Sequence, residues 1–117
     1  LRFKNNQLKF AESENYPYQM GIALQLQTNQ NGFPLKEENE QLLNMEEILE
    51  KEFTNTAIFV GVIMGEGMKE FVFYTGKPQE SAAIFERLRE EIKHHELQCN
   101  IQEDPSWEVY KTYYQRN

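Results

Sequence analysis

The sequence has little cysteine: Cys99 is its only one. A single cysteine excludes an internal disulfide and suits a reducing compartment, so we expect a cytoplasmic location. No apolar run approaches the length of a membrane span, and the N-terminal stretch is too polar for a signal peptide. We therefore expect no membrane partner.

Basic residues are also scarce. Lys and Arg number 12 against 19 Asp and Glu, which gives a net charge of -7. Such a charge repels the phosphate backbone of nucleic acids, so we expect no nucleic-acid partner. A length of 117 residues with 39% hydrophobic content suits one compact domain. We predict an unassigned N-terminal arm over residues 1–15 and a single domain over residues 16–117.

Periodicity predicts the order of the secondary-structure elements. Alternating or unbroken apolar patterns predict strands over Tyr18–Thr28, Ala57–Met64, Met68–Thr75 and Leu97–Gln102. Apolar residues at helical spacing predict helices from Leu35 to Phe53, after the turn Asn31-Gly32-Phe33-Pro34, and from about Ile84 to the pair His94-His95. A short C-terminal helix follows the last strand.

The resulting order β-α-β-β-α-β predicts an α+β fold of the ferredoxin-like type. Its four-stranded antiparallel sheet carries two helices on one face, and the other face has no helix of its own. If Glu66-Gly67 is a two-residue hairpin loop, Val60 pairs with Phe73. The same register sets Phe59 opposite Tyr74 on the helix-free face.

Aromatic residues near the C-terminus are expected to cover part of that face. Asp104 is predicted to cap a helix whose first residue is Pro105, because a proline has no N–H to leave unpaired. Trp107, Tyr110 and Tyr114 share helical spacing and form a stripe of rings. The candidate interaction surface consists of Phe59, Val72, Tyr74, Trp107 and Tyr110. The alternative is a pocket beneath the C-terminal helix, with Asp104, Tyr74 and Tyr110 as its polar groups.

Several short signatures occur in a fixed order along residues 16–114. They are Asn31-Gly32-Phe33-Pro34, Val60-Gly61-Val62, Gly67, Glu70-Phe71-Val72-Phe73-Tyr74, and Gln102-Glu103-Asp104-Pro105-Ser106-Trp107 with Tyr110. In this order they resemble the uncharacterised bacterial domain-of-unknown-function family six-nine-five. The resemblance implies no established activity, catalytic residue or cofactor. Lys69 stands where the family leads us to expect an arginine, so bidentate binding there is lost.

The predicted layout is also similar, at the level of fold, to the regulator of ribonuclease E activity B. That protein is an acidic domain of ferredoxin-like type that acts by binding an enzyme. The similarity implies regulation through a protein partner, and it rests on analogy of fold alone.

Each chemical motif has a structural explanation as well. Cys99 with His94 and His95 suggests a thiol–imidazole dyad, but Cys99 alternates with core residues and the histidines end a helix. One cysteine and two adjacent histidines cannot supply the ligands of a structural zinc site. We therefore expect no catalytic residue, metal or cofactor. Aromatic rings on a sheet also occur in RNA-recognition modules, but Lys69 lies between Glu66 and Glu70 in an acidic chain.

The glutamates of the first predicted helix form either a solvated face or a partner surface. They are Glu37, Glu38, Glu40, Glu46, Glu47, Glu50 and Glu52.

Three functional hypotheses follow. The leading one is a small non-catalytic domain that binds another protein, or its own copy, through its acidic helical face or its open sheet face. The second is a small-molecule or enzymatic module that uses the pocket beneath the C-terminal helix. The third is a structural part of a longer chain, since the sequence does not begin with Met.

Overall fold

The computed structural model describes residues 2–3, 12–27 and 36–116. The strands are β1 (Arg2–Phe3), β2 (Tyr18–Gln25), β3 (Ala57–Gly65), β4 (Met68–Thr75) and β5 (Gln98–Glu103). The helices are α2 (Lys36–Glu52), α3 (Pro78–Glu91), α4 (Glu108–Arg116) and the short 3-10 turn η1 (Ser13–Asn15). The predicted turn before the first helix, and its predicted start at Leu35, lie outside the described residues.

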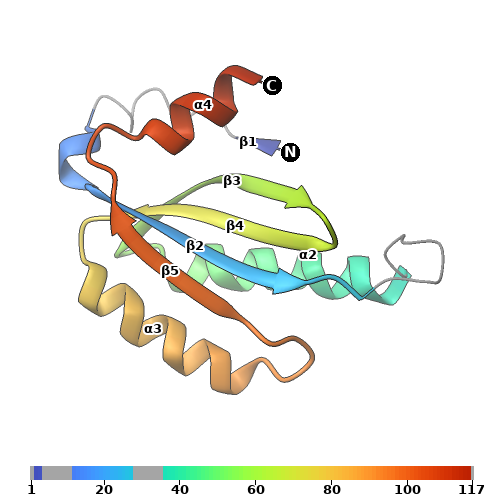
Figure 1. The fold of residues 1–117 in the computed structure, drawn as a ribbon. Coiled ribbons are helices and arrows are strands. Elements are labelled where there is room, and N and C mark those ends of the chain that lie inside the picture. Colours follow the sequence, from blue (N-terminus) through green and yellow to red (C-terminus); the bar gives the residue numbers. More distant parts are fainter. Residues whose placement is uncertain (1, 4–11, 28–35, 117) are drawn as a thin grey trace.

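The strands form one antiparallel sheet in the order β1-β3-β4-β2-β5 (Figure 1). The predicted α+β class is therefore confirmed, but the sheet has five strands and not four. The additional strand comes from the N-terminal arm, where Arg2 pairs with Val62 and Phe3 with Gly61. A two-residue strand has no readable period, which is why the sequence pattern missed it.

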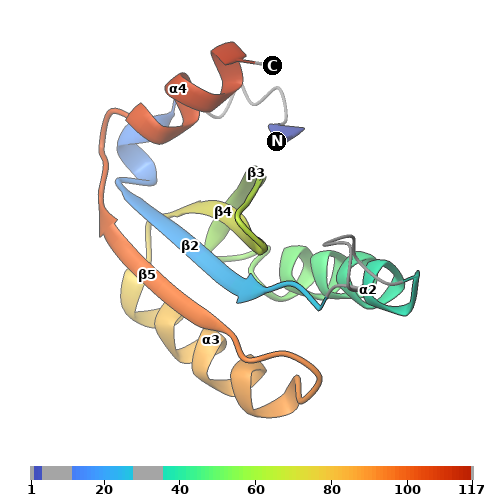
Figure 2. The ribbon, with the colours of Figure 1, turned by 45° about the vertical axis from the view of Figure 1, so that its right-hand side comes forward.

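Helices cover the two sheet faces unequally. Both α2 and α3 lie on one face, whereas α4 lies on the opposite side, close to β1 (Figure 2). The alternation predicted for β2 is confirmed, because Met20, Ile22 and Leu24 all face the helix-covered core. They pack there with residues of α2 and α3, which include Leu42, Met45, Leu49, Phe85 and Leu88.

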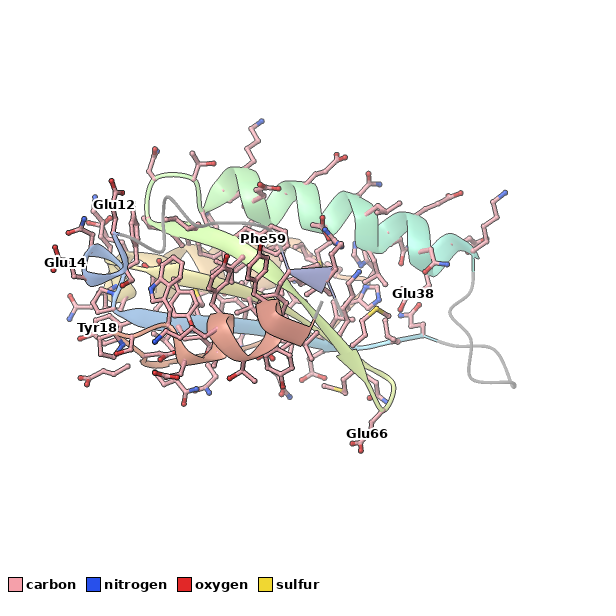
Figure 3. The ribbon with its side chains drawn as sticks, turned by 90° about the horizontal axis from the view of Figure 1, so that it is seen from above. Glu12, Glu14, Tyr18, Glu38, Phe59 and Glu66 are labelled. Carbon is pink, nitrogen blue, oxygen red and sulfur yellow. The ribbon has the colours of Figure 1, made fainter. Side chains whose placement is uncertain are left out.

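A β-bulge in β3 corrects the predicted hairpin register. Phe59 pairs with Phe73 and Gly61 with Val72, so Val60 is an extra residue. The prediction that Val60 pairs with Phe73 is wrong, because a bulge shifts the register by one and exchanges the faces of the side chains. Phe59 (labelled in Figure 3) therefore joins the helix-covered core, with its ring centroid 5.1 Å from that of Phe73.

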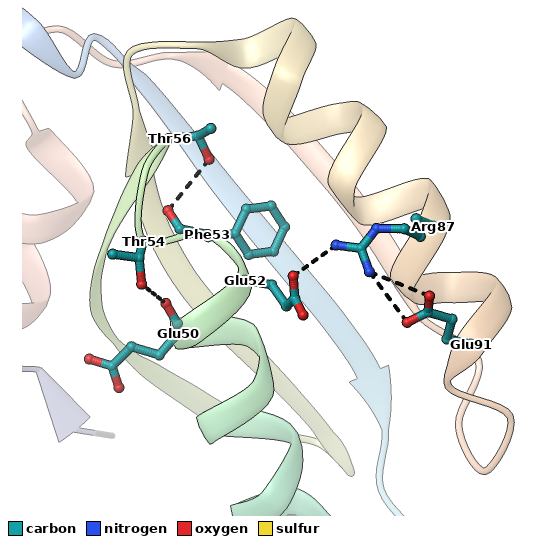
Figure 4. Close-up of polar contacts among 7 residues, drawn as sticks. All are labelled: Glu50, Glu52, Phe53, Thr54, Thr56, Arg87 and Glu91. Atoms are coloured by element: carbon teal, nitrogen blue, oxygen red, sulfur yellow. Dashed lines mark hydrogen bonds and ion pairs between the residues drawn. The ribbon is translucent and has the colours of Figure 1, made fainter.

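Polar contacts join the ends of α2 and α3 (Figure 4). Arg87 of α3 places its Nη2 atom 2.8 Å from Glu52 and its Nη1 atom 3.4 Å from Glu91. These side chains are largely exposed, so each ion pair contributes little stability.

A buried hydroxyl group lies between the sheet and α3. Thr75 Oγ1 donates to the Thr56 carbonyl oxygen at 2.7 Å and lies 2.8 Å from Ser81 Oγ. The Lys77 N–H donates to the same Thr75 oxygen at 3.0 Å. We call these residues the Thr75 network. It satisfies polar groups that would otherwise be unpaired inside the helix-covered core.

Candidate functional site

The predicted aromatic surface is a buried layer within the chain. Trp107 stacks on Tyr74 with ring centroids 4.2 Å apart and meets Tyr110 edge-on at 5.6 Å. Pairs of this kind contribute about 0.5–1.5 kcal/mol beyond area burial. The buried members of this aromatic layer are Phe3, Val60, Val72, Tyr74, Trp107 and Tyr110. Four of the five residues of the candidate interaction surface therefore lie together, while Phe59 lies on the other face. Their role in binding a partner stays a prediction, and their burial does not favour it.

Asp104 connects this layer to α4. Its Oδ1 atom accepts from the Glu108 N–H at 2.9 Å, and its Oδ2 atom accepts from the Val109 N–H at 3.1 Å. The same Oδ2 atom accepts from the Tyr74 hydroxyl at 2.6 Å, and the Tyr110 N–H donates to that hydroxyl oxygen at 3.3 Å. Asp104, Tyr74 and Tyr110, the polar groups of the predicted pocket, are thus brought together. Their hydrogen bonds cap the first turn of α4 and join it to the sheet. Burial and the Asp104 hydrogen bond raise the pKa of Tyr74 above its ordinary range.

The capping prediction was correct for Asp104 and wrong for the helix start. Helix α4 begins at Glu108, and a turn comes first, in which the Trp107 N–H donates to the Asp104 carbonyl at 3.0 Å. Trp107 itself has a φ of 56°, an uncommon value for a residue other than glycine. This conformation accompanies the stacking of its ring on Tyr74. Because the Trp107 side chain has no exposed surface, the hypothesised pocket beneath the helix is filled at this position.

A carboxylate–histidine cluster lies on the helix-covered side, and the sequence analysis missed it. The fully buried Glu38 side chain accepts from the Gln27 N–H at 2.5 Å through Oε2. Its Oε1 atom lies 2.7 Å from Nε2 of His95, whose side chain is only 2% exposed. That contact is short but is not aligned as a hydrogen bond, so it is a charge contact when the imidazole is protonated. Figure 3 labels Glu38 on α2.

His94 extends this cluster to the surface. The Nδ1 atoms of His94 and His95 lie 2.6 Å apart, so one ring must donate and the other accept. Burial, and next the charge of His95, lower the pKa of His94, whereas the Glu38 carboxylate acts in the opposite direction. The His94 imidazole is therefore more readily neutral than an ordinary histidine side chain.

One signal in the sequence could have identified Glu38. It occurs four residues before Leu42, on the same helical stripe as Met45 and Leu49, and all four are buried. A glutamate on an apolar stripe needs a partner when the helix packs. The prediction that the glutamates of α2 form a solvated face or a partner surface is therefore wrong at Glu38.

Lys69 is also buried on this side of the sheet. Its Nζ atom lies 5.2 Å from the centroid of the Phe71 ring, and burial lowers its pKa. Side chains alternate along β4, so Lys69 and Glu70 point to opposite faces. The side chains of Lys69 and Glu70 are thus on opposite sides of the sheet. Glu66 lies at the tip of the hairpin between β3 and β4 (Figure 3).

A groove of about 540 Å³ opens beside the carboxylate–histidine cluster. The end of β2 and the segment between α3 and β5 line most of it, with Gln25, Gln27, His94, His95, Glu96 and Gln98 as polar residues. Across the described part of the chain, no three His, Cys, Asp or Glu side chains gather to hold a metal ion. The groove therefore offers hydrogen-bonding groups from glutamine, glutamate and histidine side chains.

A second groove, of about 420 Å³, lies between α3 and β5. We call it the β5 groove; its lining includes Phe85, Leu97, Cys99 and Ile101, with Glu86 and Arg89 at its side. Burial raises the pKa of Cys99 to about 11, which makes the thiol a poor nucleophile at neutral pH. Cys99 lines this groove while the histidines line the other one, so the geometry gives no support to a thiol–imidazole dyad.

Strand β5 is the last strand of the sheet. No described strand pairs with its outer edge, and its six residues include no proline, lysine or bulge. Prolines, lysines and bulges are among the devices by which proteins protect open edges from other chains, and the one charged residue of β5, Glu103, lies at its last position. The outer edge of β5 and the β5 groove therefore form a surface that can accept an extended polypeptide.

Comparison with known proteins identifies a family but no activity. The model of the family of unknown function (DUF695) matches residues 1–114. No curated protein and no solved structure matches the chain. The similarity to the regulator of ribonuclease E activity B stays a prediction. None of the helices in the described ranges has the length and apolar character needed to span a bilayer.

Proposed function

We propose, for a chain that belongs to the family of unknown function DUF695, that it is a non-catalytic domain that binds an extended segment of another polypeptide along β5. The observation that supports this proposal is the outer edge of β5, with which no described strand pairs, beside the β5 groove. Addition of a strand to a sheet edge supplies affinity through main-chain hydrogen bonds and specificity through side-chain pockets.

This proposal includes a finer description of the fold. Strands β3, β4, β2 and β5, in that order, together with α2 and α3 agree with a ferredoxin-like unit, to which β1 and α4 are additions. A cytoplasmic location also belongs to the proposal, since Cys99 is a free thiol. The sequence favoured the acidic helical face or the open sheet face as the binding site. The proposal places the binding site at the outer edge of β5 instead.

Main-chain geometry supports the use of this edge. The Asp104 N–H donates to the Pro17 carbonyl at 2.8 Å, on the side of β2. Main-chain groups alternate from one side of a strand to the other, so those of Cys99, Ile101 and Glu103 point outward. A partner strand would pair with these groups.

A pair of substitutions at Ile101 tests the proposal. Ile101→Pro removes one outward N–H, and Ile101→Ala removes the same side chain but keeps that N–H. Peptides selected against the immobilised protein from a random display library should bind Ile101→Pro at least about tenfold more weakly than Ile101→Ala. Circular dichroism checks that both variants fold. Selected peptides that bind the two variants equally would refute strand addition at β5.

A second candidate function is the binding of a small polar molecule beside the carboxylate–histidine cluster. It is favoured by the groove of about 540 Å³ and by the buried Glu38–His95 contact next to it. A library of small polar fragments, screened by NMR, should then shift the resonances of His94 and Gln98. The shifts should be reduced in His94→Asn, and a library that shifts neither residue would contradict this candidate.

A further inference from the structure

We infer that the polypeptide recognised at β5 is an extended segment with apolar residues at alternate positions and cationic residues at its two ends. This inference rests on the proposed function and adds the chemical class of the partner. It follows from the two faces of the edge and from the charges at its ends.

The side of the edge that faces α3 has an apolar floor, while Glu86, Arg89, Glu96 and Gln98 supply the polar part of the groove lining. Cys99 and Ile101 are half-buried on this side of β5, and Phe85 and Leu97 lie beneath them, almost completely buried. Side chains of an added strand alternate between the two faces, so every second one would enter the β5 groove. Aliphatic side chains at these positions would bury apolar surface against Cys99 and Ile101.

The other side of the edge is polar. Gln98, Asn100 and Gln102 point to the opposite face of β5 and are exposed. Gln102 donates from Nε2 to Gln19 Oε1 at 3.2 Å, so its amide is partly used within the sheet. Hydroxyl-bearing residues at the intervening positions of the partner match these amides better than aliphatic ones.

Carboxylates lie at the two ends of the edge. Glu96 precedes β5 and Glu103 ends it; both are exposed, and neither has an ion-pair partner in the described part of the chain. Between them, Arg89 is paired with Glu86 at 3.0 Å, so it does not neutralise either end. The seven-residue separation of the two carboxylates would correspond to at most roughly 23 Å of an extended partner.

Charge also disfavours a second copy of this chain as the occupant. Two copies would each contribute a net charge of -7 and the same two terminal glutamates. A segment with lysine or arginine at its ends instead gains attraction at each end of the edge.

Two synthetic peptides test this inference on the full chain. Each has a centre of alternating valine and threonine; one is flanked by lysines and the other by glutamates. The lysine-flanked peptide should bind roughly threefold to tenfold more tightly at low salt, and the difference should shrink as salt screens the charges. Binding of this peptide should also slow the alkylation of Cys99, which lies on the apolar side of the edge.

Charge-neutral variants provide the matched control. The double variant Glu96→Gln with Glu103→Gln should lose the preference for the lysine-flanked peptide. Glu47→Gln, which removes one charge from the exposed face of α2, should retain that preference. Equal binding of the two peptides, with Ile101→Pro still weakening both, would overturn the inference and leave the proposed function standing. Peptides that neither protect Cys99 nor respond to Ile101→Pro would count against the proposed function itself. A dimer broken by Ile101→Pro but not by Ile101→Ala would identify a second copy as the occupant and overturn the inference.

Discussion

The two faces of the sheet are covered by different means. On the helix-covered face, apolar residues such as Met20, Leu49 and Phe85 come from long elements with a clear period. On the other face, the aromatic layer brings together Phe3 from one end of the chain and Trp107 from the other. A core built by periodic elements forms wherever those elements pack. A layer built by the chain ends depends on particular contacts that hold those ends in place.

Each face also contains a group of buried hydrogen bonds that joins its elements. The Thr75 network joins the sheet to α3 on the helix-covered face. On the other face, Asp104 joins Tyr74 to the first turn of α4. The comparison indicates that α4 belongs to the folded core and is not an appendage.

Removal of the largest ring is the strongest test of this comparison. Trp107→Ala should lower the free energy of unfolding by about 3–5 kcal/mol, because it leaves a cavity against Tyr74. Leu49→Ala, the matched change in the helix-covered core, should cost about 2–5 kcal/mol. Urea denaturation followed by circular dichroism measures both values. If Trp107→Ala cost less than about 1 kcal/mol, the aromatic layer would be a loosely held cover.

Loss of one hydroxyl on each face is a finer test. Tyr74→Phe removes the buried hydroxyl that accepts from the Tyr110 N–H and donates to Asp104. Thr75→Val removes the oxygen at the centre of the Thr75 network. Each change should cost about 1–3 kcal/mol in chemical denaturation. Tyr74→Phe should also increase hydrogen exchange in α4, and Thr75→Val should not; equal exchange in the two variants would argue against separate roles for the two groups.

The smallest expected effect concerns the part of the helix-free face around Glu70. Glu70 is half-buried, and its carboxylate lies over Gly21 of the neighbouring strand β2. A Cβ atom at position 21 would collide with that carboxylate. Burial raises the Glu70 pKa above the ordinary value of 4.5. A raised pKa adds stability that is fully present below pH 4.5 and lost as the pH rises through the folded-state pKa.

Glu70→Gln should therefore stabilise the protein slightly at pH 7, by roughly 0.5 kcal/mol or less, because it removes a partly buried charge. At a pH below the ordinary glutamate pKa, Glu70→Gln should have the same free energy of unfolding as the unmodified protein, or a slightly lower one. Thermal melts at the two pH values provide the measurement. A variant that is less stable at pH 7 would show that the Glu70 carboxylate has a favourable interaction.

Much of the fold was predictable from the sequence by itself, most of it on the helix-covered face. The faces of β2, the apolar stripe of α2 and the α+β class follow from local spacing, while the cap at Asp104, on the other face, follows from its residue type. Local spacing reports the geometry of a single strand or helix, and that geometry is nearly independent of what packs against it. The family signatures, read in order, agreed with this organisation.

Only the tertiary structure determined the rest. The bulge at Val60 exchanged the faces of β3, Arg2 and Phe3 became a strand by pairing with β3, and the turn before α4 placed Trp107 on Tyr74. Glu38 became a buried residue because His95, distant in the sequence, lies against it. Burial and register depend on which segment arrives as the neighbour, and no periodicity within one element contains that information.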